Sequence, residues 1–182
     1  GTVVEGTLGL SSRSVGGQLR IPALGGDLAL DVASSPSKLA VTHRGQGIIS
    51  LIDIKTAADG SGISLTCGDP HSTEGLVFKE IQTDCDKAHL VELGALGFGE
   101  AEDVRDPFGV AFFGPQDDRG VAVGFLNNAG LILFDLANDA STWLTNPSFL
   151  SLGGSLVSGT ESLVNYPGDP QLLAATGRGE SF

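Results

Sequence analysis

The sequence predicts an all-β fold built from antiparallel four-stranded sheets, and three observations support this prediction. Apolar residues come in short bursts that Gly, Pro, Asn or Asp brings to an end, which is the punctuation of β-strands. The chain contains 27 Gly, and no long segment keeps a helical period. The bursts also recur in the same order at fixed offsets, which indicates a repeated structural unit.

The strands follow from the apolar bursts, each of which is rich in Val, Ile, Leu and Phe. They are expected at 28–33, 39–42, 48–54, 109–113, 121–125 and 131–134. Two stretches, 84–96 and 138–144, have a mixed period and lie near Gly or Pro. We expect at most a turn or two of helix in them.

The repeat is visible in the residues themselves. The segment Pro36–Gly45 returns as Pro170–Gly179 at an offset of 134 positions, with Pro, Leu, Ala, Thr, Arg and Gly unchanged. A further copy lies at an offset of 82, since the strand that ends on Asp53 matches the one that ends on Asp135. The units cover about 21–55, 106–137 and 160–182, and 56–105 is an insertion between the first two.

Each unit has one plan: a strand, a Pro/Gly/Asp turn, a second strand, a Gly/Asn turn and a third strand. Such a meander cannot bury its faces alone and must pack against neighbours of its own kind. Radial stacking of blades in a β-propeller satisfies this requirement. We therefore expect residues 1–182 to form a single β-propeller segment.

The segment Asp31–Ile54, DVASSPSKLAVTHRGQGIISLIDI, resembles the YVTN-type β-propeller repeat. Leu39–Gly45 stands at the central signature of that repeat. In the second unit Gly124 replaces the Thr of the signature, and the third unit matches the first two strands only. The resemblance implies blades of four antiparallel strands and carries almost no information about chemistry, because propellers have many unrelated functions.

The number of units predicts an incomplete propeller, because rings usually close with four to eight blades. Two nearly full units are followed by one that stops at Phe182. The missing strands are expected from another protein chain, from further copies of this chain or from a continuation of the polypeptide. Gly17–Ile21 is expected to be a strand that completes a neighbouring blade.

The cysteines point to an oxidising compartment. Cys67 and Cys85 are 18 positions apart among turn formers, without the CxxC spacing of a metal pair. A disulfide that closes a loop inside the insertion is favoured over free thiols, with metal binding a minor alternative. The expected location is extracytoplasmic: periplasmic, cell-surface or secreted. The chain lacks Met, even at position 1, so we expect a processed or trimmed chain.

Charge and hydropathy exclude two classes of partner. Acidic residues outnumber basic ones 22 to 10, for a net charge of −12, which opposes binding to nucleic acid. No apolar run is long enough for a membrane-spanning helix.

Motifs of catalysis and cofactor binding are missing, so no catalytic residue, metal or cofactor is predicted. His43, Arg44 and Arg178 are the candidates for a channel or loop face, because they end repeated strands. Asp53 and Asp135 recur at one repeat position, which favours a structural role within the blade. The Asp-rich turns lack calcium-loop spacing.

The core is expected on the inward face of the strands. Its predicted members are Leu30, Val32, Leu39, Val41, Ile49, Leu51, Val110, Phe112, Val121, Val123, Leu131, Leu133, Leu163 and Leu172.

Three functional hypotheses follow. The first is an exported non-catalytic propeller module for protein binding or scaffolding, with the insertion 56–105 as the place of acquired function. The second is a lactonase-like propeller enzyme, which the family resemblance also permits. The third is the propeller portion of a larger redox assembly whose cofactors are held by another chain.

Overall fold

The computed structural model describes residues 19, 21–59, 62–68, 83, 85–98, 104–137, 143–152, 157–166 and 169–179. The predicted all-β fold is confirmed, because this part of the chain consists of strands with two single 3₁₀ turns and no α-helix. The elements are β1 (Gly25–Asp31), β2 (Ser37–His43), β3 (Ile48–Thr56), β4 (Ile63–Thr66), η1 (Lys87–His89), β5 (Leu90–Glu92), η2 (Leu93–Leu96), β6 (Pro107–Phe113), β7 (Gly120–Phe125), β8 (Asn128–Leu136), β9 (Leu144–Ser151), β10 (Val157–Tyr166) and β11 (Asp169–Gly179).

Both helix candidates of the sequence can be placed. The described part of the stretch 84–96 has the short helical turns η1 and η2 on either side of strand β5, in agreement with the expected turn or two of helix. Positions 138–142 of the other candidate lie outside the described residues, and β9 begins at Leu144. Among the described residues, no helix has the length and apolar character needed to cross a membrane.

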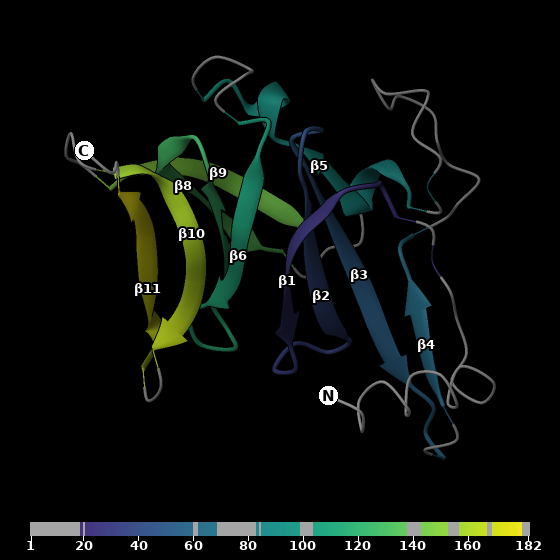
Figure 1. Cartoon of the computed structure of the whole chain (residues 1–182). Helices are drawn as coiled ribbons and strands as arrows, with labels where there is room; N and C mark the ends of the chain where they lie inside the picture. The colour runs from purple at the N-terminus through teal and green to yellow at the C-terminus, as the bar shows by residue number, and fades with distance from the viewer. Residues whose placement is uncertain are drawn as a thin grey trace, which may run out of the picture.

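The strands form three antiparallel sheets, named here the first, second and third sheet. The first has the order β1-β2-β3-β4, with β5 also on β3; the second has the order β6-β7-β8-β9; the third consists of β10 and β11. The leading strands β1, β6 and β10 lie side by side, and the other strands of each sheet extend away from them (Figure 1). This arrangement stacks the sheets face to face around their leading strands.

The first two sheets share one register. Leu28 pairs with Val41 in the first sheet, and Val110 pairs with Val123 in the second, 82 positions further along. Every pair between β1 and β2 has such a counterpart between β6 and β7, including the irregularity that follows the first pair. The offset of 82 therefore applies to the pairing of the strands as well as to the amino-acid sequence.

The insertion contributes the outer edge of the first sheet in two pieces. β4 pairs with the end of β3 at 53–56, and β5 pairs with its beginning at 48–50. Cys67 directly follows β4, and Cys85 lies shortly before β5. Two short pieces of the segment 56–105 are thus integral to the first sheet, and the two cysteines lie between them, where the outer strand is interrupted.

The core lies between the sheets. One cluster joins the first and second sheets and contains Ala40, Ile49, Leu51, Val110, Phe112, Val121, Val123, Phe125, Ile132 and Phe134 among others. A smaller one joins the second sheet to Leu163 of the third through Ala111, Ala122 and Leu131. A third covers part of the opposite face of the first sheet with Val41, Ile48, Ile52, Cys67, Cys85 and Leu90.

Two of the predicted core residues are wrong. Leu30, in β1, is 55% exposed and Val32, directly after β1, is 75% exposed, because no described segment covers them. Leu39 and Leu133 are only half-buried, and the side chain of Leu172 lies outside the described residues. The other predicted positions are buried: Val41, Ile49, Leu51, Val110, Phe112, Val121, Val123, Leu131 and Leu163.

The predicted strand Gly17–Ile21 is described only at Leu19 and Ile21, which belong to no strand. Both side chains pack against the cluster that contains Val41 and Ile52. Leu28 pairs with Val41, and Leu30 pairs with Leu39, which in turn pairs with Ile52, so all of these residues lie on one face of the first sheet. The chain therefore enters the fold across this face.

Candidate functional site

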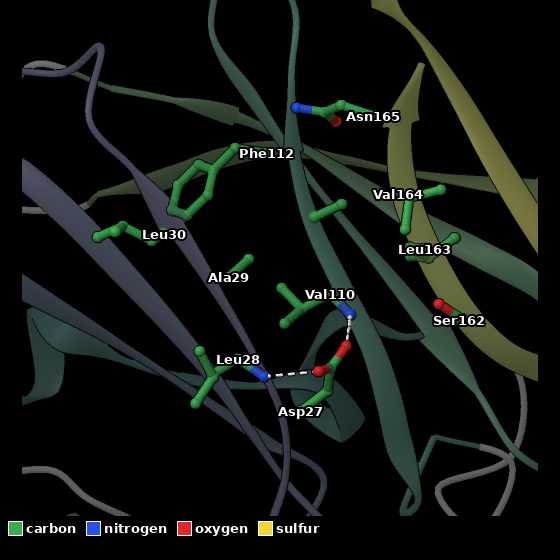
Figure 2. Close-up of a pocket in the computed structure, with 11 residues that line it drawn as sticks. Asp27, Leu28, Ala29, Leu30, Val110, Phe112, Ser162, Leu163, Val164 and Asn165 are labelled. Carbon is green, nitrogen blue, oxygen red and sulfur yellow. Dashed lines mark hydrogen bonds between the residues drawn. The ribbon is translucent and has the colours of Figure 1, made fainter. Parts of the chain in front are cut away.

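An open hollow of about 370 Å³ lies where the three sheets meet. Each sheet contributes its leading strand to the wall: residues 27–30 of β1, 110–112 of β6 and 162–165 of β10. Figure 2 shows Ala29 and Val110 directed toward the space between β1 and β6, with Leu28 and Leu30 on the other side of β1. All three sheets therefore contribute residues to the surface of this hollow.

Asp27 is the charged residue of this wall. Its carboxylate accepts hydrogen bonds from the backbone N–H of Leu28 at 2.9 Å and of Val110 at 3.2 Å (Figure 2). The second bond crosses from β1 to β6. Both carboxylate oxygens of Asp27 therefore accept hydrogen bonds, and its side chain links the first sheet to the second.

The rest of the lining offers little chemistry. Its other polar side chains are Ser162 and Asn165, and the remaining members are apolar. Nucleophilic catalysis needs a base within hydrogen-bond reach of the nucleophile, and the lining places no histidine near Ser162. Among the described residues no group of three or more His, Cys, Asp or Glu side chains could hold a metal ion.

His43 lies on neither a channel nor a loop face, which corrects the prediction for this residue. It is fully buried at the end of β2, and its Nε2 lies 2.8 Å from the hydroxyl of Ser50. Burial lowers the pKa of His43 below 6.5, and the backbone carbonyls of Ala23 and Pro22 offset only part of this shift. The equivalent residue of the second sheet, Phe125, is also fully buried, so the position is an interior one.

Arg44 lies in the turn after β2, with a half-exposed side chain, in agreement with a loop face. Its Nε is 3.9 Å from Oδ1 of Asp106, and its guanidinium lies 5.6 Å from the centre of the Phe108 ring. Both contacts join the first sheet to the start of the second. The side chain of Arg178 lies outside the described residues.

A second link between the sheets is formed by Asp31 and Arg119. Arg119 donates to Asp31 at 2.7 Å and also to the carbonyl of Gly114, beside a hollow of about 320 Å³. Burial alone would raise the pKa of Asp31, but hydrogen bonds from Arg119, Ser34 and the Ala33 N–H outweigh it and hold this pKa below 3.8. The carboxylate is therefore charged in the folded protein at neutral pH.

A buried polar chain runs through the outer part of the same interface. Lys38 forms an ion pair with Asp53, and its Nζ lies 3.3 Å from the centre of the Trp143 ring. The indole N–H of Trp143 donates to Nε2 of His89 at 2.8 Å, and Nδ1 of His89 lies 2.7 Å from Asp86. Because Nε2 accepts a hydrogen bond, the proton of His89 must be on Nδ1, where it is donated to Asp86.

This chain of contacts joins three parts of the molecule. Lys38 and Asp53 belong to the first sheet, His89 to the insertion and Trp143 to the residues just before β9 of the second sheet. The alternation of residues along β2 is a partial signal for the burial of Lys38. Lys38, Ala40 and Thr42 are every second residue of β2 and therefore lie on the same face of the strand. Because Ala40 and Thr42 are fully buried, Lys38 also lies on an inward face.

The predicted disulfide between Cys67 and Cys85 is present. The bridge closes a loop inside the insertion, as expected, and both cysteines are almost fully buried and pack with Val41 and Ile52 in the core of the first sheet. The bridge thus holds β4 and β5 on β3. For a closed loop of this length the chain-entropy model gives a stabilisation of roughly 3 kcal/mol.

Comparison of the chain with protein-family models, with curated proteins and with solved structures found no match.

Proposed function

We propose that this chain is a non-catalytic β-propeller module, exported from the cytoplasm, that serves protein binding or scaffolding. The shared register at the offset of 82 supports a repeated blade. The side-by-side leading strands β1, β6 and β10 support radial stacking of those blades (Figure 1). The resemblance of Leu39–Gly45 to the YVTN-type signature agrees with both.

The exposed apolar strip on β1 carries the proposal of a binding role. Leu28 is 63% exposed and Leu30 is 55% exposed, on one face of β1, and Val32, directly after the strand, is 75% exposed. Val110 and Phe112, the counterparts of Leu28 and Leu30 in the second sheet, are each only 2% exposed because the first sheet covers them. A row of large apolar residues that is covered in one sheet and uncovered in its counterpart is a typical docking surface for protein.

The disulfide supports the proposed export, because disulfides form and persist mainly in oxidising compartments. The proposal leaves out catalysis because His43 lies in the interior and the lining of the hollow pairs no nucleophile with a base. Asp27, the carboxylate of that lining, already accepts two backbone hydrogen bonds.

Site-specific photocrosslinking tests the binding role. A photoreactive amino acid is placed at position 30, and in a matched variant at position 24, whose leucine is 67% exposed but precedes β1. The protein is produced with export in its source cells and irradiated. We expect a discrete protein adduct from position 30 and none from position 24. A position-30 variant that gives no adduct would contradict a docking surface on β1.

A further inference from the structure

The sheets of this molecule pack by one rule, in which unlike faces meet. The first sheet carries the cross-strand pair Ala29–Ala40 on one face, here called the alanine face. The opposite, bulky face carries Leu28 and Leu30. The same division holds in the second sheet, with Ala111–Ala122 on its alanine face and Val110 and Phe112 on its bulky face.

Both internal contacts join an alanine face to a bulky face. The alanine face of the first sheet packs against the bulky face of the second in the largest core cluster. The alanine face of the second sheet packs against Leu163 of the third. In the register of the third sheet Leu163 pairs with position 175, as Leu28 pairs with Val41, so Leu163 occupies a bulky-face position.

This rule leaves one face of each kind without a neighbour in the described structure. The first is the bulky face of the first sheet, at Leu28, Leu30 and Val32. The second is the alanine face of the third sheet, where Val164 pairs with position 174 as Ala29 pairs with Ala40. Val164 is 52% exposed, which agrees with an uncovered face.

The free part of the bulky face of the first sheet is narrow. Leu19, Ile21 and the disulfide segment already cover the outer part of the bulky face of the first sheet. Its uncovered part is the strip on β1, which has room for a narrow sheet. The described strands of the third sheet are β10 and β11.

We infer that a second copy of this chain docks head to tail, with the alanine face of its third sheet on the β1 strip of the first copy. This inference rests on the proposed binding role of the strip and names its partner. Two copies joined by two such contacts would form a ring of six sheets, within the range of propellers. Because both copies carry a net charge of −12, added salt should strengthen the association.

Complementation between two variants tests this arrangement. Leu30→Glu damages only the β1 strip, and Val164→Glu damages only the free face of the third sheet. We expect the wild type to sediment as a dimer and each variant alone to be monomeric. An equimolar mixture of the two should recover a dimer, because one undamaged contact remains between unlike copies. Leu24→Glu, a charge added at an equally exposed leucine off the strip, should sediment like the wild type. Circular dichroism and thermal unfolding of each protein establish that it is folded.

Three results would overturn the inference. A wild type that stays monomeric at all concentrations and salt levels would exclude self-association. A Val164→Glu variant that remains dimeric would show that the two β1 strips meet each other. A mixture that stays monomeric would exclude the head-to-tail contact. If the photocrosslinked adduct from position 30 contains a different protein, the binding role stands and the inference of a second copy fails.

Discussion

The bulky faces of the first and second sheets carry similar residues at equivalent positions but differ in their exposure to solvent. Leu28 and Leu30 occupy the same register positions as Val110 and Phe112, and all four are large and apolar. One pair is more than half exposed, and the other is almost fully buried. A strand's own pattern therefore tells which residues can be buried, whereas its neighbours decide which ones are buried.

The largest difference between the two sheets should appear when the same deletion is made in each. Phe112→Ala removes a buried ring and should lower the free energy of unfolding by about 3–5 kcal/mol. Leu30→Ala, at the equivalent position, should cost the monomer less than about 1 kcal/mol, because most of that side chain already contacts water. Urea unfolding of both variants at a concentration where the protein is monomeric checks this. Equal losses would mean that the β1 strip is covered.

The second comparison concerns Lys38 and its counterpart Gly120, which pair with Asp53 and Asp135. Asp53 is buried and relies on Lys38, whereas Asp135 is exposed and accepts a hydrogen bond from Asn146. Lys38→Met should therefore lower the free energy of unfolding by about 3 kcal/mol, because it leaves a buried carboxylate without its cation. The double variant Lys38→Met, Asp53→Leu should recover most of this loss. A double variant as unstable as the single one would show that Lys38 acts through its contact with Trp143.

A smaller effect is expected at Gly124, the counterpart of Thr42. The Thr42 hydroxyl lies 3.1 Å from the carbonyl of Phe108 and so links the first sheet to the second. Gly124 has no side chain, and Thr160 of the third sheet fills the space where one would lie. A Cβ added at Gly124 would be 2.7 Å from the Cβ of Thr160. Gly124→Ala should cost about 1–3 kcal/mol through this crowding.

Thr160→Gly provides the control for that prediction. Combined with Gly124→Ala, it should recover part of the lost stability, because it removes the atoms that the new methyl group meets. Strictly additive losses in a double-mutant cycle would indicate that the third sheet does not pack on the second at this point.

The smallest effect concerns pH at Asp31, whose counterpart is Phe113. The pKa of Asp31 is lowered in the fold, so this carboxylate adds stability above pH 3.8, and that contribution is lost as the pH falls through the folded pKa. The difference in unfolding free energy between the wild type and Asp31→Asn should be constant near neutral pH and shrink below about pH 4. Thermal unfolding between pH 3 and 7 measures it. A difference that stays constant across this range would show that the pair with Arg119 does not stabilise the fold.

Much of the fold was predictable because its signals are local. The turn formers mark the strand ends, and the recurrence at 82 fixes the alignment of two sheets to the residue. The YVTN-type resemblance remains a prediction. Burial was predicted correctly at Val123, which the first sheet helps to cover, and at Val41, which packs with Leu19 and Ile21. It was predicted wrongly at Leu30 and Val32, where it depends on a surface that the strand itself does not encode.

The site was less predictable, because it is made of contacts between distant segments. His43 was expected at a surface since it ends a strand, but this strand end is covered by Ile21 and its neighbours. The contacts of Lys38 with Trp143, and of Trp143 with His89, join residues 105 and 54 positions apart. Spacing along the sequence carries no information about such pairs.

The interrupted outer strand of the first sheet has a consequence for the order in which the molecule folds. β1, β2 and β3 follow one another directly and can pair as soon as they are made, whereas β5 reaches β3 only after the chain has closed a long excursion. Until then β3 presents the unpaired backbone of Ile48–Ser50 at its edge, an open template for strands of other chains. Oxidation of Cys67 and Cys85 holds β4 and β5 on β3 and so keeps this edge in its covered form.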